Sequence, residues 1–248
     1  MAQAKVIYGI HAVMAALNHH PENILSLFCE EKAENTRLQV LLEKAHEAKL
    51  TVQYLSENKL NKLTQSTHHQ GIAVKMRNTQ TVDEHAVYTW LENAAKPPLL
   101  LLLEGIQDPH NLGACLRSAE ALGVDWVVVV RAQAVSLNAT VSKVSCGADQ
   151  KLSIIAVGNL VRFIGQIQKR GVWVIGTSLQ AHAKNLAQVD LKRPVALVMG
   201  SEGTGLKHLT IESCDEIACI PLLGVTASLN VSVATGICLY ECQRQRLC

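Results

Sequence analysis

Apolar and polar positions alternate in two different ways along this chain. Up to residue 76, pieces with helical spacing are interleaved with strand-like pieces, among them "GIHAVMAALN", "ILSLFCEE", "NTRLQVLLEKAHEAKL" and "GIAVKM". This pattern predicts a small α/β domain over residues 1–76. From residue 99 onward, continuous apolar runs are separated by glycine-containing turns and helical segments. Runs that are apolar on both faces are typical of a mostly parallel sheet with helices on both sides, which predicts a larger α/β domain over 99–248.

The same pattern locates the elements of the larger domain. We expect strands over 99–104, 126–130, 152–155, 172–176, 195–199 and 217–220. We expect helices over 111–122, 136–145, 159–169 and 229–244. The intervening residues 77–98 lose the periodicity and end in Pro-Pro, which disfavours a helix, so they are predicted to be a linker.

The composition limits the classes of protein to which the chain can belong. Its 248 residues are 48% apolar, which is ample for buried cores without disulfide bonds. The 23 Lys and Arg residues against 21 Asp and Glu residues give a net charge of +2, so any nucleic-acid partner must be met by a local patch. No apolar run is long enough to span a bilayer, and no membrane association is expected.

The eight cysteines are interpreted as reduced thiols that fill the core of a cytoplasmic protein. They lie mostly in apolar segments, without a C-x-x-C pair and without a secretory signal before them, at positions 29, 115, 146, 214, 219, 238, 242 and 248. Cys238 and Cys242 are one helical turn apart and could suit a metal. No matching Cys or His pair accompanies them, so core packing is favoured and no metal is expected.

The first of three polar loops is "EGIQDPHNLGACLRSAEALG", residues 104–123. Asn111 stands where the N-cap of the following helix is expected. Arg117 lies on the second turn of that helix among apolar residues, where a guanidinium needs a partner. From this loop alone, a surface ion pair and a functional anion contact are equally acceptable interpretations of Arg117.

The second loop is "VALVMGSEGTGL", residues 195–206, in which Gly200, Gly203 and Gly205 surround Glu202. Glycines let the main chain come close to a ligand and present its amide and carbonyl groups. The spacing is neither the dinucleotide fingerprint nor a P-loop, which disfavours a phosphate cradle. A plain tight turn is the alternative, although it needs only one or two glycines.

The third loop is "CIPLLGVTASLNVSVATG", residues 219–236. Either Thr226 or Ser228 is expected to cap the next helix. Ser228 and Ser232 lie four positions apart and should share a face, with Asn230 rotated away. A serine-capped buried helix explains this loop by itself. All three loops follow predicted strands, however, and the carboxyl ends of parallel strands lie at one sheet edge, so Arg117, Glu202, Ser228 and Asn230 are expected to converge on one pocket.

Together the stretches "DPHNLGACLRSAEALG", "LVMGSEGTGL" and "IPLLGVTASLNVSVATGICLYE" resemble the three signature motifs of the SpoU/TrmH-type RNA ribose 2′-O-methyltransferases of the SPOUT superfamily. The N-terminal piece resembles the L30e-like RNA substrate-binding domain of this family. Within the family, the chain is most similar to the enzymes that methylate a guanosine ribose in the peptidyl-transferase P loop of 23S rRNA.

The resemblance implies a trefoil-knotted catalytic domain, S-adenosylmethionine (SAM) as methyl donor, no metal, and a homodimer formed through the catalytic domains. It implies 23S rRNA or a pre-ribosomal particle as partner, with no DNA or membrane partner. It also implies that main-chain groups around one set of residues hold SAM: Thr177, Met199, Gly200, Gly205, Ile220 and Leu229. The RNA is expected to contact the N-terminal domain and the pocket rim, with Arg131, Lys143 and Lys151 as candidates for phosphate contact and solvated surface charge as the alternative.

The resemblance assigns activation of the ribose 2′-hydroxyl to Arg117, within a site shaped by Asn111, Glu202, Ser228 and Asn230. A free guanidinium has a pKa above about 12 and is a poor base. We therefore expect Arg117 to bind the target phosphate or hydroxyl and stabilise the developing alkoxide. The alternatives are a tRNA ribose 2′-O-methyltransferase of the same family, a catalytically inactive RNA-binding protein, and a nucleotide-binding oxidoreductase. The absence of G-x-G-x-x-G after the first strand of the larger domain weakens the last of these.

Overall fold

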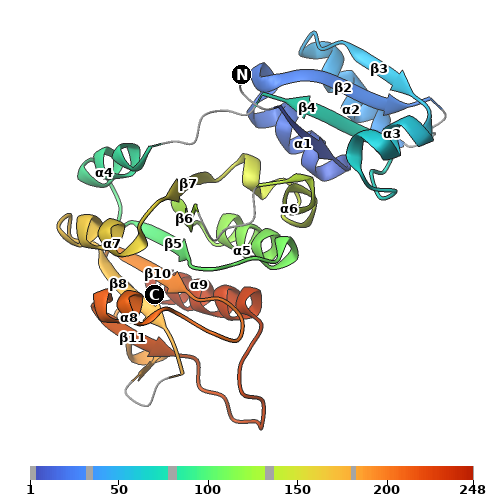
Figure 1. The fold of residues 1–248 in the computed structure, drawn as a ribbon. Helices are drawn as coiled ribbons and strands as arrows, with labels where there is room; N and C mark the ends of the chain where they lie inside the picture. Colours follow the sequence, from blue (N-terminus) through green and yellow to red (C-terminus); the bar gives the residue numbers. More distant parts are fainter. Residues whose placement is uncertain (1–3, 32–35, 78–82, 132–136, 180–182, 248) are drawn as a thin grey trace. The chain divides into compact units, whose positions relative to one another are not determined.

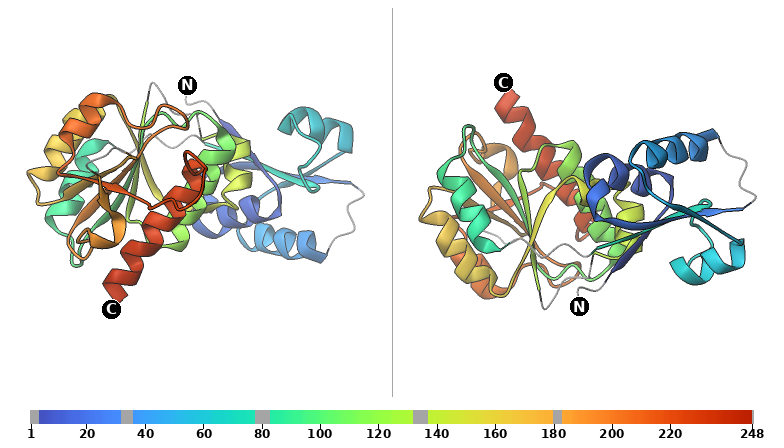
Figure 2. Two further views of the ribbon diagram at one scale, coloured as in Figure 1. Left: turned by 90° about the horizontal axis from the view of Figure 1, so that it is seen from below. Right: turned by 90° about the horizontal axis from the view of Figure 1, so that it is seen from above.

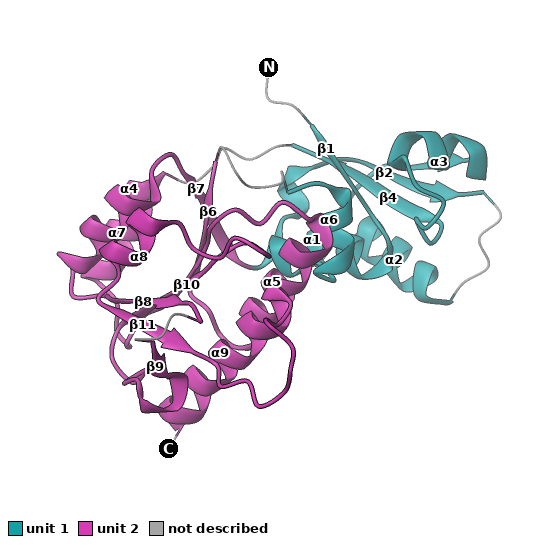
Figure 3. Ribbon diagram, turned by 60° about the horizontal axis from the view of Figure 1, so that its bottom comes forward, with its two compact units in different colours: residues 1–80, 136–151 teal, residues 81–135, 152–248 magenta. Residues whose placement is uncertain are grey.

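A computed structural model describes residues 4–31, 36–77, 83–131, 137–179 and 183–247 of the chain (Figure 1). The chain forms two compact units (Figure 3). Unit 1 consists of residues 1–80 and 136–151, and unit 2 consists of residues 81–135 and 152–248. The smaller unit therefore takes one of its two segments from the middle of the chain.

Unit 1 is built on a four-stranded sheet in the order β1-β4-β2-β3. Its strands are β1 (Lys5–Tyr8), β2 (Ile24–Glu30), β3 (Val52–Leu55) and β4 (Ile72–Met76). Strand β4 is antiparallel to both β1 and β2, whereas β2 and β3 are parallel. The helices α1 (Ile10–His19) and α2 (Thr36–Glu47) bury apolar side chains against one face, and α3 (Glu57–Thr64) packs on the other. The small α/β fold predicted from the alternating pattern is observed.

The second segment of unit 1 packs beside the edge strand β1. It contains α6 (Ala139–Val144) and the short helix η2 (Ala148–Gln150). Ala139 packs against the cluster around Tyr8 and Leu60, and Gly147 lies so close to α1 that a Cβ there would overlap Ala15. The helix predicted over 136–145 begins at Ala139, because the Asn138 side chain caps it by accepting the Val141 N–H at 3.0 Å. Residue 136 lies outside the described residues.

Unit 2 is built on a seven-stranded sheet in the order β7-β6-β5-β10-β8-β11-β9, and every pairing in it is parallel. Its strands are β5 (Leu99–Leu103), β6 (Trp126–Val130), β7 (Ser153–Val157), β8 (Trp173–Thr177), β9 (Lys184–Asn185), β10 (Val195–Met199) and β11 (Glu216–Cys219). The predicted parallel sheet is confirmed, and six of its strands agree with the apolar runs to within two residues at each end. The seventh, β9, has only two residues and leaves no apolar run. The implied trefoil knot stays a prediction.

Helices cover both faces of this sheet (Figure 2). On one face, α4 (Glu84–Glu92), α7 (Leu160–Gln168) and α8 (His208–Ser213) pack on alternate residues of the central strands, such as Leu100 and Val198. On the other, α5 (Pro109–Ala121) packs along α9 (Val231–Leu247). Helix α4 lies inside the segment 77–98 that was predicted to be a linker. It forms because Val87, Tyr88 and Leu91 recur at helical spacing and are buried, which outweighs the local signal of Pro97 and Pro98.

The cysteines agree in part with the expectation of core-filling thiols. Cys29, Cys115, Cys238 and Cys242 are buried, Cys214 and Cys219 are half-buried, and Cys146 is exposed. Cys248 lies outside the described residues. Across the ranges that the structure describes, no helix has both the length and the apolar character needed to cross a membrane.

Candidate active site

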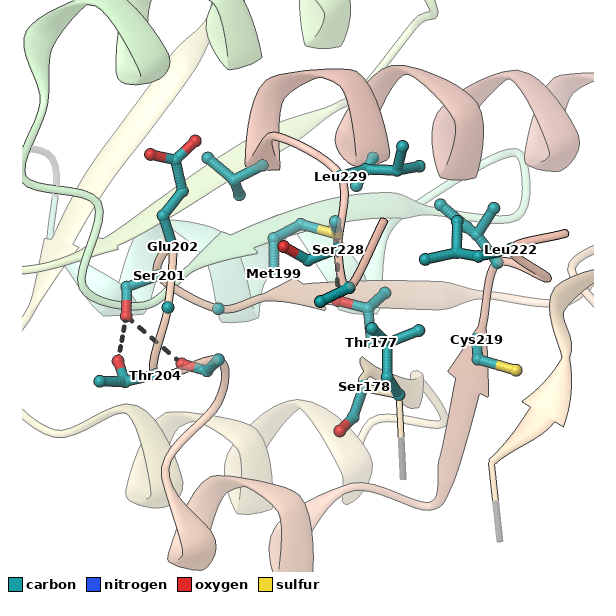
Figure 4. A pocket seen from close by; sticks show the side chains of 18 of the residues that line it. Thr177, Ser178, Met199, Ser201, Glu202, Thr204, Cys219, Leu222, Ser228 and Leu229 are labelled. Atoms are coloured by element: carbon teal, nitrogen blue, oxygen red, sulfur yellow. Dashed lines mark hydrogen bonds between the residues drawn. The ribbon is translucent and has the colours of Figure 1, made fainter. Parts of the chain in front are cut away.

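A cavity of about 500 Å³ opens at the carboxyl edge of the parallel sheet of unit 2 (Figure 4). Thr177 ends β8, Met199 ends β10 and Cys219 ends β11, and all three line the cavity. The volume is in the range of ordinary small-molecule sites. The loops that follow β10 and β11 supply the remaining walls. The cavity therefore lies at the edge of the sheet where parallel α/β proteins bind their ligands.

One wall is the glycine loop, which we define as residues 200–206. Ser201 and Gly205 exchange two backbone hydrogen bonds, of 3.2 and 2.9 Å, and close the loop on itself. Gly203 and Gly205 have φ of +82° and +66°, a region that only glycine enters freely. A Cβ on Gly200 would overlap the backbone of Gly205 and Leu206. Gly203 and Gly205 are thus required by the backbone conformation of the loop, and Gly200 is required by its close packing on Gly205 and Leu206.

Asn230 joins the three predicted loops. Its side-chain NH2 donates to Glu202 Oε1 in the glycine loop and to Asn111 Oδ1 at 2.9 Å. Its side-chain oxygen accepts from the Ser232 N–H at 2.9 Å, the Ser232 hydroxyl at 2.6 Å and the Val233 N–H at 3.4 Å. Asn230 therefore caps α9, a role that was predicted for Thr226 or Ser228. Asn230 also contacts Ser232, from which it was expected to be rotated away, because the cap holds it outside the helical turn.

Helix α5 begins at Pro109, two residues before the predicted start at residue 111. Its N-cap is Asp108, whose carboxylate accepts the His110 N–H at 2.9 Å, and not Asn111. Pro109 occupies the first helical position, where its fixed φ suits the helix and its missing N–H costs nothing. Asn111 therefore lies within the first turn, and its side chain is released from capping to contact Asn230.

The structure brings four of the five residues predicted as catalytic together. Glu202 and Ser228 line the cavity, while Asn111 and Asn230 belong to the hydrogen-bond network beside it. Arg117 does not line the cavity. It is exposed on α5, and it forms no hydrogen bond or ion pair with any residue that the structure describes. All six positions predicted to hold the cofactor line the cavity: Thr177, Met199, Gly200, Gly205, Ile220 and Leu229.

The cavity has an apolar and a polar part. The apolar part is lined by the side chains of Met199, Ile220, Leu222 and Leu229. The polar part is lined by hydroxyl groups and one carboxylate, those of Thr177, Ser178, Ser201, Glu202, Thr204 and Ser228. The Thr177 hydroxyl donates to the Val198 carbonyl at 3.0 Å. Sequence reasoning did not single out Ser178, Ser201 or Leu222. Each lies one or two positions from a predicted cofactor-binding residue. This closeness in the sequence is the feature by which they could have been predicted.

Burial controls the charge state of the thiol between α5 and α9. Cys115, on α5, lies 3.5 Å from the Thr235 hydroxyl of α9. Burial raises the pKa of the Cys115 thiol to about 11, and the Glu202 carboxylate adds to the rise while the Thr235 contact opposes it. Cys115 thus remains a neutral thiol that fills the α5–α9 interface. Cys238 and Cys242, which were weighed as metal ligands, are buried neutral thiols whose pKa values are raised to about 12, chiefly by burial.

The three basic residues expected to contact RNA phosphate are divided between the two units. Lys143 and Lys151 belong to unit 1. Lys143 Nζ lies 5.8 Å from the centre of the Tyr8 ring. Arg131 follows β6 in unit 2 and donates to the Ala156 carbonyl at 3.2 Å. None of the three lines the cavity. Within the residues that the structure describes, no group of three or more His, Cys, Asp or Glu side chains is placed to hold a metal ion.

Two protein families match the chain. Residues 98–240 match the SpoU rRNA Methylase family, and residues 6–82 match the family described as RNA 2′-O ribose methyltransferase substrate binding. The chain is 47% identical over 246 residues to the 23S rRNA (guanosine-2′-O-)-methyltransferase RlmB of Coxiella burnetii, covering 99% of this chain and 98% of that protein.

Solved structures with the same fold are also known. The crystal structure of an RNA 2′-O ribose methyltransferase superposes with a TM-score of 0.82 at 27% identity, covering 100% of this chain and 90% of that one. The SpoU methyltransferase AviRb from Streptomyces viridochromogenes, in complex with the cofactor AdoMet, gives a TM-score of 0.81, with 98% of this chain and 90% of that one covered. At 20% identity, AviRb supports the fold alone.

Proposed function

The chain belongs to the SpoU rRNA Methylase family and is an RNA 2′-O-methyltransferase, and from this premise we propose that it methylates the ribose 2′-hydroxyl of a guanosine in 23S rRNA, with SAM as methyl donor. The single observation that carries the proposal is the cavity at the carboxyl edge of the sheet, with the Asn111–Asn230–Glu202 network beside it. We place the target guanosine in the peptidyl-transferase P loop, and the protein in the cytoplasm.

The residues of the cavity fit SAM. An adenine ring needs apolar surface above and below it, which Ile220, Leu222 and Leu229 offer, whereas the ribose and the amino acid part need polar groups. Thr177, Ser178, Ser201 and Ser228 provide hydroxyls in the same cavity. The glycine loop adds main-chain groups without a side chain at Gly200, Gly203 or Gly205. When bound, SAM supplies a methyl group attached to a positively charged sulfur.

In this mechanism the protein acts by positioning and by electrostatics. Displacement at a methyl group needs alignment of its reactants and no covalent help from a side chain. Because Asn230 donates to Asn111 Oδ1, the Asn111 NH2 is left to donate to the RNA, and it has no partner among the described residues. The Glu202 carboxylate is held by Asn230, with its other oxygen available to accept a hydrogen bond from the ribose hydroxyl. Arg117 contributes a positive charge that stabilises the developing alkoxide or binds the adjoining phosphate.

Unit 1 binds the RNA in this proposal, with Lys143 and Lys151 among its phosphate contacts. The match of residues 6–82 to a substrate-binding family supports the assignment. We infer that unit 1 has the L30e-like fold of such domains. Its RNA is 23S rRNA, met either free or in a pre-ribosomal particle, and shape recognition is expected to matter more than bulk charge.

The catalytic unit is proposed to form a homodimer through the outer face of α9. Val233, Ile237 and Tyr240 lie at i, i+4 and i+7 on this face and are exposed. Leu223 and Val225, in the loop before α9, are also exposed. Burying such a patch against a second copy removes it from water. Sedimentation equilibrium is expected to give a dimer, and Ile237→Asp is expected to give a monomer; a monomeric unmodified protein contradicts this part of the proposal.

The activity is tested with methyl-tritiated SAM and three RNAs: protein-free 23S rRNA, a pre-ribosomal large subunit, and total tRNA. We expect label in 23S rRNA or in the particle, on the 2′-oxygen of one guanosine that mapping places in the P loop. Label confined to tRNA establishes the tRNA methyltransferase instead. Binding of RNA without any label transfer establishes an inactive RNA-binding protein.

A further inference from the structure

Glu104 is a buried carboxylate to which neither the sequence nor the proposed mechanism assigns a role. It follows β5 directly and is only 4% exposed, which is rare for a carboxylate unless both oxygens have partners. Both do: Oε2 accepts the Lys207 backbone N–H at 3.0 Å, and Oε1 accepts the Thr210 hydroxyl at 2.9 Å. Thr210 is itself buried. Glu104 does not line the cavity, so its contacts serve another purpose.

The main chain of Glu104 makes a third contact with the same part of the molecule. Its N–H donates to the Met199 carbonyl at 2.9 Å. Met199 is the residue immediately before the glycine loop, and Lys207 is the residue immediately after it. Glu104 therefore holds both ends of the loop that lines the cavity and carries Glu202.

The glycine loop needs such a restraint. Three of its seven residues are glycines, which lose more conformational entropy on ordering than any other residue. Its own closure consists of the Ser201–Gly205 backbone pair and the bond of 2.6 Å between the Ser201 and Thr204 hydroxyls. Fixing the two ends lowers the entropic cost of holding the loop in one conformation. A loop that is already ordered pays less to bind a ligand.

We propose that Glu104 is a positioning residue, which holds the glycine loop in its ligand-binding conformation and so sets the affinity for the methyl donor without touching it. This rests on the proposed function, because it takes SAM as the ligand of the cavity. The alternative is that Glu104 stabilises the fold alone. The two differ in their consequences, since loss of a fold contact lowers the melting temperature, whereas loss of loop order also weakens SAM binding.

The test compares four variants of the full chain by calorimetric titration with SAM and by thermal melting. Glu104→Met removes both acceptors at similar length and leaves the Lys207 N–H without a partner, so the Kd for SAM is expected to rise about ten-fold or more. Glu104→Gln is the conservative variant. The glutamine oxygen still accepts the Lys207 N–H, and the Thr210 hydroxyl can turn to accept from the glutamine NH2. The Kd for SAM is therefore expected to stay within about three-fold of that of the unmodified protein.

Asp125→Leu is the matched control. Asp125 is also a largely buried carboxylate beside β5, and its Oδ2 accepts the Leu99 N–H at 2.9 Å at the amino end of that strand, away from the cavity. We expect this variant to melt earlier but to bind SAM as the unmodified protein does. Thr210→Val removes one of the two bonds and keeps the carboxylate. Hydrogen exchange at residues 203–205 is expected to be faster in Thr210→Val and in Glu104→Met, and unchanged in Asp125→Leu.

The outcomes separate the two proposals. If the unmodified protein takes up no SAM, the proposed function fails. If it binds SAM and Glu104→Met binds equally tightly, the inference about Glu104 fails while the function stands. If Glu104→Met does not fold, hydrogen exchange at residues 203–205 of Thr210→Val tests the inference instead. Exchange that is as slow as in the unmodified protein overturns the inference.

Discussion

Asn230 and Asn111 stand 119 positions apart in the chain, and their side chains are joined by a hydrogen bond of 2.9 Å. Asn230 uses its remaining N–H for Glu202 and its oxygen for the first turn of α9. Every hydrogen-bonding group of its side chain is therefore committed. Helix capping and the arrangement of the site depend on the same side chain, and a substitution can separate the two roles.

Asn230→Asp is expected to preserve the cap of α9 but to disrupt the hydrogen bonds with Asn111 and Glu202. A carboxylate accepts from the Ser232 N–H as the amide oxygen does, so the melting temperature should change little. It cannot donate to Asn111, and it sets a second negative charge against Glu202. Methyl transfer is expected to fall at least about ten-fold. Asn159→Asp, the same change at the cap of α7, is the control, since Asn159 accepts the Arg162 N–H away from the cavity. Equal activity of the two variants would contradict the role of the network.

Gly200→Ala is expected to open the glycine loop. The added methyl group would overlap the backbone of Gly205 and Leu206, and backbone cannot move aside as a flexible side chain can. SAM binding measured by calorimetry should be lost or greatly weakened. Gly224→Ala serves as control in the neighbouring loop, where a Cβ meets no atom within 4 Å. If Gly200→Ala binds SAM normally, the closed loop is not the binding conformation.

Arg117→Lys is expected to preserve the fold and SAM binding while losing most of the turnover. The side chain is exposed and lacks partners among the described residues, so the free energy of unfolding should change by less than about 0.5 kcal/mol. Lysine keeps the charge but lacks the planar set of donors. Arg162→Lys is the control, because Arg162 is an exposed arginine on α7 that pairs with Glu84. Near-normal methylation of 23S rRNA by Arg117→Lys would remove Arg117 from the mechanism.

Arg246→Lys is expected to destabilise unit 2. The half-buried guanidinium donates to four carbonyls, at 2.8 to 3.0 Å, those of Pro97, Pro98, Leu191 and Arg193. A lysine cannot reach all four, and we expect the free energy of unfolding to fall by about 2 kcal/mol in urea titrations. Arg244→Lys, where an exposed guanidinium pairs with the largely buried Glu241 carboxylate, should cost less, about 1 kcal/mol or below. Equal losses would show that Arg246 acts as an ordinary surface charge.

Four thiols whose pKa values are raised, three of them buried and the Cys214 thiol half-buried, predict how the stability of the protein changes at alkaline pH. Burial raises the pKa of Cys115 to about 11 and those of Cys214, Cys238 and Cys242 to about 12. A raised pKa means that the folded state holds the proton more firmly than the unfolded state. The resulting stability is complete below about pH 8.5, the ordinary thiol value, and is lost as pH rises toward 11 to 12. The urea concentration at the midpoint of unfolding should therefore decrease as the pH is raised above 9.

Thiol labelling gives an independent measurement of the same property. At pH 8 the native protein should react rapidly with an aromatic disulfide at the exposed Cys146 and slowly at four buried thiols, those of Cys29, Cys115, Cys238 and Cys242. Cys146→Ser should remove one equivalent from the fast phase. Loss of an equivalent from the slow phase instead would contradict the placement of Cys146.

The central strands of the parallel sheet could be located from the sequence because they are buried on both faces. A run such as Leu99–Leu103 or Val195–Met199 is then apolar at every position, whatever its neighbours are. The loops after these strands were found for a related reason, since polar residues and glycines interrupt apolar runs where strands end. Six cofactor positions and four catalytic positions accordingly lie at the cavity edge or its network.

Other features depended on contacts between distant residues. Helix α4 forms in the expected linker because its apolar face is buried against α7 and the sheet. Residues 136–151 pack with unit 1 although they follow a strand of unit 2. Neither preference can be seen in a local window of sequence, because the surface that is buried belongs to another part of the chain.

The sequence by itself determined the fold class, the strand ends and the residue types of the site, because apolar runs and turn chemistry are local properties. Only the tertiary structure decided that Asn230 rather than Thr226 or Ser228 caps α9, that Arg117 lies outside the cavity, and that Glu104 holds the glycine loop. The contacts of Asn230 with the site and of Glu104 with the glycine loop are made with residues 28 to 119 positions away in the chain, and a local stretch of sequence does not show which of its polar groups will meet such a partner.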